Sequence, residues 1–126
     1  MKVLTDTHTL VWALSAPEAL GAGARAALTG ATFTASVANL WELVLKSRRP
    51  GALIADPLPW WEKYVIRLRI PTLAVRAAHI RKMANLPEIH KDPFDRLLIA
   101  QALAEGLTLV SKDTIMARYD AAVIWD

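Results

Sequence analysis

The chain has 126 residues, of which 54% are apolar and 21% are charged, and it contains no cysteine. This length and composition predict one domain over residues 1–126 and exclude a disordered chain, a disulfide framework and a thiolate metal site. Because no apolar run approaches the ~20 residues of a membrane span and no signal peptide is evident, we expect a cytoplasmic protein that does not span a membrane.

The formal charge of +3 is unevenly distributed along the chain. Residues 46–91 contain ten Lys or Arg against three acids, a net charge of +7, whereas the segments before and after them are slightly acidic. A basic middle beside acidic ends is typical of a protein that binds a polyanion and holds a metal in an acidic site. Solvated helix faces would give the same charges, so both interpretations stay open on charge alone.

Short apolar segments alternate with helical ones. In chain order, the pattern predicts a strand at 2–5, helices at 8–15 and 22–30, a strand at 31–36, and helices at 37–49 and 56–68. An extended segment at 69–73 follows, then helices at 74–86 and 93–106, a strand at 107–111, a short helix at 113–119 and a strand at 121–125. Because the strands are continuously apolar, we expect a mainly parallel sheet in a three-layer α/β/α sandwich.

Four carboxylates fall near the predicted carboxyl ends of strands. Asp6 follows a strand directly, and Asp113 follows one after Lys112. Glu42 lies two turns into the helix after the second strand, and Asp95 lies in the first turn of the helix at 93–106. Ligands of such sheets bind beyond these strand ends. Converging acids repel one another unless a cation lies between them, and Mg²⁺ or Mn²⁺ prefers oxygen ligands. Such an ion can activate water and neutralise phosphate oxygens during phosphodiester hydrolysis.

Each of these acids also has a purely structural explanation. Asp6 and Asp113 could cap the helices that follow them, Glu42 could pair with Lys46, and Asp95 could interact with its helix dipole. However, Glu42 and Asp95 lie among apolar neighbours, where a carboxylate without a partner is costly. The residues alone leave both explanations open.

No other motif predicts a chemical activity. The three histidines, His8, His79 and His90, are scattered without an H-E-x-x-H sequence, so a zinc site is not expected. We assign His79 to surface or packing. A Walker loop, a G-x-G-x-x-G fingerprint and a G-x-S-x-G elbow are all absent.

Three stretches of the sequence resemble a known family. The stretch "LTDTHTLVWAL" is similar to the start of a PIN domain, "ASVANLWELVLKSRRPGAL" to its second block, and "HKDPFDRLLIAQALAEGLTLVSKD" to its third and fourth blocks. Together they resemble the VapC-type toxins of bacterial and archaeal toxin–antitoxin pairs. The resemblance spans essentially the whole chain, although residues 52–90 match only loosely.

This resemblance implies a PIN-like fold and a Mg²⁺- or Mn²⁺-dependent endoribonuclease. It implies that the catalytic and metal-binding acids are Asp6, Glu42, Asp95 and Asp113, the last at a position that varies among relatives. The third acid of the family directly precedes an "xLLIA" stretch, so this role falls on Asp95.

Further residues and partners follow from the same resemblance. Asp92 is assigned only to capping the helix that begins at Pro93. Thr7 and Ser36 match small polar positions near the site and are candidate substrate-binding residues. Arg96 is a third candidate, which could contact substrate phosphate or form a surface ion pair. The family also implies an RNA substrate, a homodimer, and a cognate VapB-type antitoxin whose C-terminal segment wraps the toxin.

Two other functions remain to be considered. A degenerate PIN-like domain could bind or assemble without catalysis, although the presence of all four acids argues against it. A phospho-acceptor signalling domain is also a parallel α/β protein of this length. That class needs an acidic pair at the end of the first strand, where this sequence has only Asp6.

Overall fold

Five parallel strands form the centre of the computed structural model, which describes residues 1–126. The strands are β1 (Lys2–Thr5), β2 (Thr32–Ser36), β3 (Thr72–Leu73), β4 (Thr108–Val110) and β5 (Val123–Ile124), and they lie in the order β3-β2-β1-β4-β5. Val3 pairs with Phe33 of β2 on one side and with Thr108 of β4 on the other. Every neighbouring pair is parallel, which confirms the predicted sheet.

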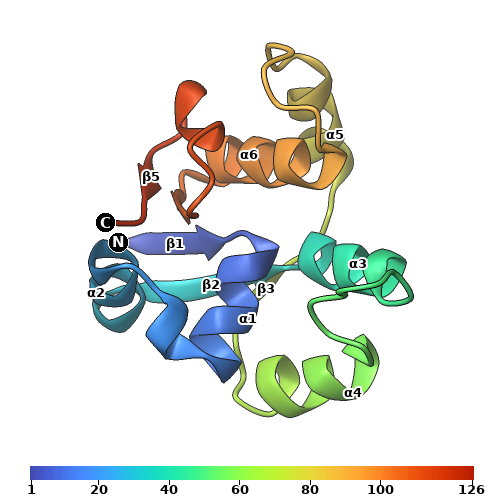
Figure 1. Cartoon of the computed structure of the whole chain (residues 1–126). Helices are drawn as coiled ribbons and strands as arrows, with labels where there is room; N and C mark the ends of the chain where they lie inside the picture. Colours follow the sequence, from blue (N-terminus) through green and yellow to red (C-terminus); the bar gives the residue numbers. More distant parts are fainter.

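Helices cover both faces of this sheet. They are α1 (Thr7–Ser15), α2 (Ala22–Gly30), α3 (Val37–Lys46), α4 (Pro57–Trp61), α5 (Ala77–Ala84) and α6 (Pro93–Glu105). In Figure 1, α5 and α6 lie above β1, α1 and α4 lie below it, and α2 lies at its left end; the packing of Leu4 against α6 and of Val3 against α2 places these two helices on opposite faces of the sheet. The predicted three-layer arrangement is therefore confirmed. The longest helix, α6, has 13 residues, and none of the helices combines the length and hydropathy needed to span a bilayer.

The core explains why the strands are apolar along their whole length. Neighbouring residues of a strand point to opposite faces, and Leu4 packs with Leu98 of α6 while Val3 packs with Ala24 and Ala27 of α2. A third cluster joins α1, β2 and the α4 region through Leu10, Ala35, Trp61 and Val65. Both faces of β1 are thus buried, so its carboxyl end is fixed from both sides.

The structure differs from the predicted elements at several helix ends. The α-helix expected over 56–68 ends at Trp61 and continues as a π-helical turn, η2 (Glu62–Ile66), in which the N–H of Arg67 bonds to the carbonyl of Glu62 at 3.1 Å. Pro17 begins a 3₁₀ turn, η1 (Pro17–Ala19), that was not predicted. Helix α3 ends at Lys46, three residues earlier than expected.

The helix predicted over 113–119 is reduced to a single 3₁₀ turn, η3 (Met116–Arg118). Side chains replace helical hydrogen bonds here, because Ser111 Oγ accepts from the N–H of Asp113 and Asp113 Oδ1 accepts from the N–H of Ile115. Short polar side chains compete with helix formation in this way.

Candidate active site

Asp6 lies at the carboxyl end of β1, and hydrogen bonds fix both of its carboxylate oxygens. Oδ1 accepts from the backbone N–H of Thr9 at 3.0 Å, so Asp6 caps α1. Oδ2 accepts from the hydroxyl of Ser111 at 2.5 Å. Ser111 directly follows β4, the strand beside β1, so this bond joins the ends of two neighbouring strands. Asp6 can therefore cap α1 with one oxygen while the bond from Ser111 fixes the orientation of its carboxylate in the site.

Glu42 is a buried residue of α3 whose carboxylate is held from two sides. The hydroxyl of Thr7 donates to Oε1 at 2.6 Å, and Nδ2 of Asn39 donates to the Thr7 hydroxyl at 3.1 Å. The ammonium group of Lys46 donates to Oε2 at 2.6 Å, which confirms the pair expected at four-residue spacing. Burial alone would lower the pKa of Lys46, but the hydrogen bond and charge of Glu42, with a smaller effect of Asp92, raise it.

Asp95 lies in the first turn of α6, where its side chain is partly buried beside other acids. Asp92 caps this helix, because its Oδ1 accepts from the N–H of Asp95 at 3.2 Å. Burial raises the pKa of Asp95 to about 7, and the negative charges of Asp92, Glu42 and Asp6 act in the same direction, while His90 opposes them. A proton or a metal cation would relieve this repulsion.

Asp113 follows β4 and contacts a histidine that was not predicted to belong to the site. Nε2 of His90 lies 2.6 Å from Oδ2 of Asp113 and 3.1 Å from Oδ2 of Asp95. The other oxygen of Asp113 accepts from the N–H of Ile115 at 2.8 Å. His90 therefore joins the acids that follow β4 and begin α6.

These carboxylates line one cavity of about 340 Å³, which we call the carboxylate cleft. Its lining residues are Asp6, Thr7, His8, Thr9, Trp12, Glu42, Lys46, Asp92, Asp95, Lys112 and Asp113. The structure thus brings together all four predicted acids and adds Asp92, which had been assigned only to capping. Carboxylate oxygens that line one cavity are ligands of the kind that a hard divalent ion such as Mg²⁺ or Mn²⁺ prefers, and the ligand atoms of Asp95, Asp113 and His90 lie within 4.8 Å of one another.

Thr7 lies in the cleft as expected, but Ser36 does not. The side chain of Ser36 is fully buried, and its hydroxyl donates to Oε1 of Gln101 at 2.6 Å and accepts from the N–H of Ala38 at 3.0 Å. The expectation that Ser36 contacts substrate is therefore wrong for this geometry. Its role is to begin α3, the helix that carries Glu42.

Arg96 also points away from the carboxylate cleft. Its guanidinium donates to the carbonyls of Pro87 at 2.9 Å and Met83 at 3.1 Å, and to the hydroxyl of Tyr119 at 3.3 Å. Arg96 was expected either to contact substrate or to form a surface ion pair. These bonds, to two carbonyls and a hydroxyl, fit neither role. Arg96 instead holds the segment after α5 against α6.

Two of the residues that sequence reasoning missed, Ser111 and Asn39, had a weak signal in the sequence. Ser111 is a polar residue at the end of an apolar strand, two positions before Asp113, and this placement could have identified it. Asn39 lies one turn before Glu42 on the same helix, where helix geometry brings side chains together. The sequence held no comparable signal for His90.

Comparisons with known proteins agree with this fold. The PIN domain family model matches residues 3–122. The chain is 31% identical over 115 residues to Ribonuclease VapC22 of Mycobacterium tuberculosis, covering 88% of this chain and 86% of that protein.

Solved structures are similar in fold at lower sequence identity. The structure of VapBC2 from Rickettsia felis bound to a promoter DNA fragment matches with a TM-score of 0.71 at 18% identity, covering 100% of both chains. The DNA-bound VapBC of Salmonella typhimurium matches with a TM-score of 0.70 at 17% identity, covering 98% of this chain and 97% of that one. The family match and the curated relative together show that this chain belongs to the PIN-domain family and, within it, to the VapC ribonucleases.

Proposed function

We propose that this protein is a metal-dependent endoribonuclease that acts in the cytoplasm as the toxin of a VapBC-type toxin–antitoxin pair. The observation that carries the proposal is the carboxylate cleft, in which Asp6, Glu42, Asp95 and Asp113 line a single cavity. The relationship to Ribonuclease VapC22 supports RNA as the substrate class.

In this proposal, the four acids hold one or two Mg²⁺ or Mn²⁺ ions through their carboxylate oxygens. When bound, such an ion activates the attacking water and neutralises charge on the phosphodiester. Asp95 must lose its proton to serve as a ligand, and its pKa of about 7 makes that loss possible near neutral pH.

Neighbouring side chains keep the acids in place for this task. Ser111 and the N–H of Thr9 orient the carboxylate of Asp6, while Thr7 and Lys46 orient that of Glu42. Preorganised ligands of this kind do not have to be reordered during the reaction. Basic residues between Lys46 and Lys91 would hold the RNA backbone, which makes binding sensitive to salt.

The proposal is tested by substituting single acids. Asp6→Asn and Asp95→Asn should abolish cleavage of a single-stranded RNA in Mg²⁺ or Mn²⁺ while circular dichroism shows an intact fold. Asp120→Asn, an exposed acid outside the cleft, is the matched control and should retain full activity. Full activity of either cleft variant, or equal activity in EDTA, would contradict the mechanism.

The partner assignment needs a separate experiment. We propose a VapB-type antitoxin and a homodimer of this chain, and the similar solved structures include VapBC complexes. Co-expression with the product of an adjacent short reading frame should yield a stable complex without ribonuclease activity. Recovery of the two proteins as separate species, with cleavage undiminished, would contradict this assignment.

A further inference from the structure

A second cavity, of about 190 Å³, adjoins the carboxylate cleft at the end of α3. The two cavities share Thr7, His8, Glu42 and Lys46 in their linings. The remaining wall of the second cavity consists of Leu43 and residues 49–54, so we call it the 49–54 hollow. A ligand in the cleft could therefore extend directly into this hollow.

The chemistry of the 49–54 hollow differs from that of the cleft. Its wall contains the apolar side chains of Leu43, Leu53 and Ile54, and Arg49 is an exposed cation that forms no ion pair. Glu42, at the boundary with the cleft, is the one acid in the lining. An apolar wall beside unpaired positive charge suits a ligand that has both a flat apolar part and a negative charge, as a nucleotide has.

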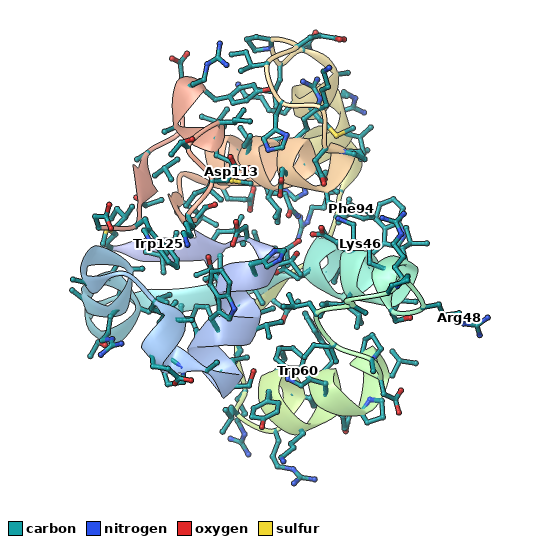
Figure 2. All side chains as sticks on the ribbon, viewed as in Figure 1. Lys46, Arg48, Trp60, Phe94, Asp113 and Trp125 are labelled. Atoms are coloured by element: carbon teal, nitrogen blue, oxygen red, sulfur yellow. The ribbon has the colours of Figure 1, made fainter.

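Lys46 lies on the boundary between the two cavities. Its ammonium group is 2.6 Å from Oε2 of Glu42 and 3.5 Å from Oδ2 of Asp92, and it lies 5.7 Å from the centre of the Phe94 ring. Figure 2 shows Lys46 and Phe94 close together where α3 meets α6. An ammonium group has three N–H donors. Lys46 therefore keeps a donor for a negatively charged group of a ligand that extends from the cleft into the hollow. The side chain is 35% exposed, which leaves it accessible.

We propose that the 49–54 hollow is the subsite for the nucleotide next to the scissile phosphate of a single-stranded RNA. Lys46 contacts the phosphate at the boundary, Arg49 contacts a neighbouring phosphate, and Leu53 and Ile54 contact the base. This inference rests on the proposed ribonuclease function, because the cleft must hold the scissile phosphate. It assigns part of the RNA specificity to a loop outside the catalytic acids.

The phosphate contacts are tested by RNA binding in EDTA, where cleavage cannot occur. Arg49→Gln and Lys46→Gln should weaken binding of a short single-stranded RNA, and each should reduce the slope of log K against log salt by about 0.7. Lys46→Arg, which keeps the charge, should retain the wild-type slope. Lys2→Gln, at the opposite end of the sheet, is the control and should behave as wild type. Unchanged slopes for both Gln variants would overturn the phosphate contacts.

The base contact is tested by filling the hollow with a larger side chain. Leu53→Trp should occupy the hollow, raise KM for RNA and change the base preferred next to the cleaved bond. Leu58→Trp, at an exposed leucine outside both cavities, is the matched control. Sequencing the products of a randomised RNA measures the preference.

Each outcome separates this inference from the proposed function. If wild type cleaves RNA and Leu53→Trp matches it in KM and base preference, the subsite is wrong and the ribonuclease proposal stands. If Leu53→Trp cleaves normally but no longer binds the antitoxin, the hollow receives protein rather than RNA, and the inference is overturned. If wild type does not cleave RNA, the ribonuclease proposal itself fails, whatever the binding results are.

Discussion

Nε2 of His90 lies within hydrogen-bonding distance of both Asp113 and Asp95, at 2.6 and 3.1 Å. Its Nδ1 accepts from the backbone N–H of Asp92 at 3.1 Å, which assigns the hydrogen of a neutral imidazole to Nε2. The three side chains have ligand atoms within 4.8 Å of one another and could share an ion. The tautomer favours a different arrangement, in which His90 donates to the carboxylates and the carboxylates face the metal.

We predict that His90→Ala weakens the site without removing a metal ligand. The Mn²⁺ affinity, measured by calorimetry, should fall about 10- to 100-fold, as is usual when a residue that orients a ligand is lost. Because His90 acts through Asp113, the same substitution should have a smaller effect in an Asp113→Asn background. Equal effects in both backgrounds would show that His90 does not act through Asp113.

The raised pKa of Asp95 predicts how the stability of the metal-free protein depends on pH. Asp95 keeps its proton up to about pH 7 when folded, but loses it near its ordinary pKa of 3.8 when unfolded. The folded state therefore binds more protons between these values, and this group's contribution to the free energy of unfolding falls as pH rises through that window. Above about pH 7, the folded protein keeps the ionised carboxylate of Asp95 partly buried beside the other negatively charged side chains of the cleft.

Asp95→Asn should accordingly stabilise the metal-free protein at pH 8, by an amount on the order of a few kcal/mol. The difference should shrink as pH falls through the window, and it should vanish only below about pH 3.8, because at pH 5 the unfolded wild-type side chain is still ionised. Urea denaturation in EDTA at both pH values measures this. An equal difference at pH 5 and pH 8 would show that the pKa of Asp95 is not raised.

The same titration predicts that metal binding releases a proton. At pH 6 the carboxyl group of Asp95 is mostly protonated, and a bound ion requires it to be deprotonated. Calorimetry of Mn²⁺ binding in buffers of different ionisation enthalpy should show close to one proton released at pH 6 and almost none at pH 8.5. The Asp95→Asn variant is the control, and its binding should release no such proton.

The sequence located the acids better than it located their neighbours. Asp6 and Asp113 could be placed because each follows an apolar strand, and parallel strands end at the same edge of a sheet. Arg96 was misplaced because adjacency to Asp95 was taken for proximity, whereas neighbouring residues of a helix point about 100° apart. His90 could not be found, because its contacts depend on how the loop before α6 packs against the residues after β4.

Substituting Ser36 tests whether this residue stabilises the fold or contacts the substrate. Ser36→Ala removes the cap of α3 and leaves the buried Oε1 of Gln101 without its donor, so the free energy of unfolding should fall by about 2 kcal/mol. Because the side chain is fully buried, KM for RNA should stay unchanged at a temperature where the variant is folded. A higher KM with unchanged stability would restore the substrate role.

Ser111 gives the final prediction, because its hydroxyl links the two acids that follow neighbouring strands. It donates to Oδ2 of Asp6 at 2.5 Å and accepts from the N–H of Asp113 at 3.0 Å. Ser111→Ala should therefore lower both the Mn²⁺ affinity and kcat, by about tenfold or more. Ser15→Ala, which removes the hydroxyl of an exposed serine bonded to the carbonyl of Val11 and lies outside the cleft, is the control and should retain activity. If Ser111→Ala matches wild type in both quantities, the bond from Thr9 alone is enough to orient Asp6. The link between the ends of β1 and β4 would then be a packing detail rather than part of the site.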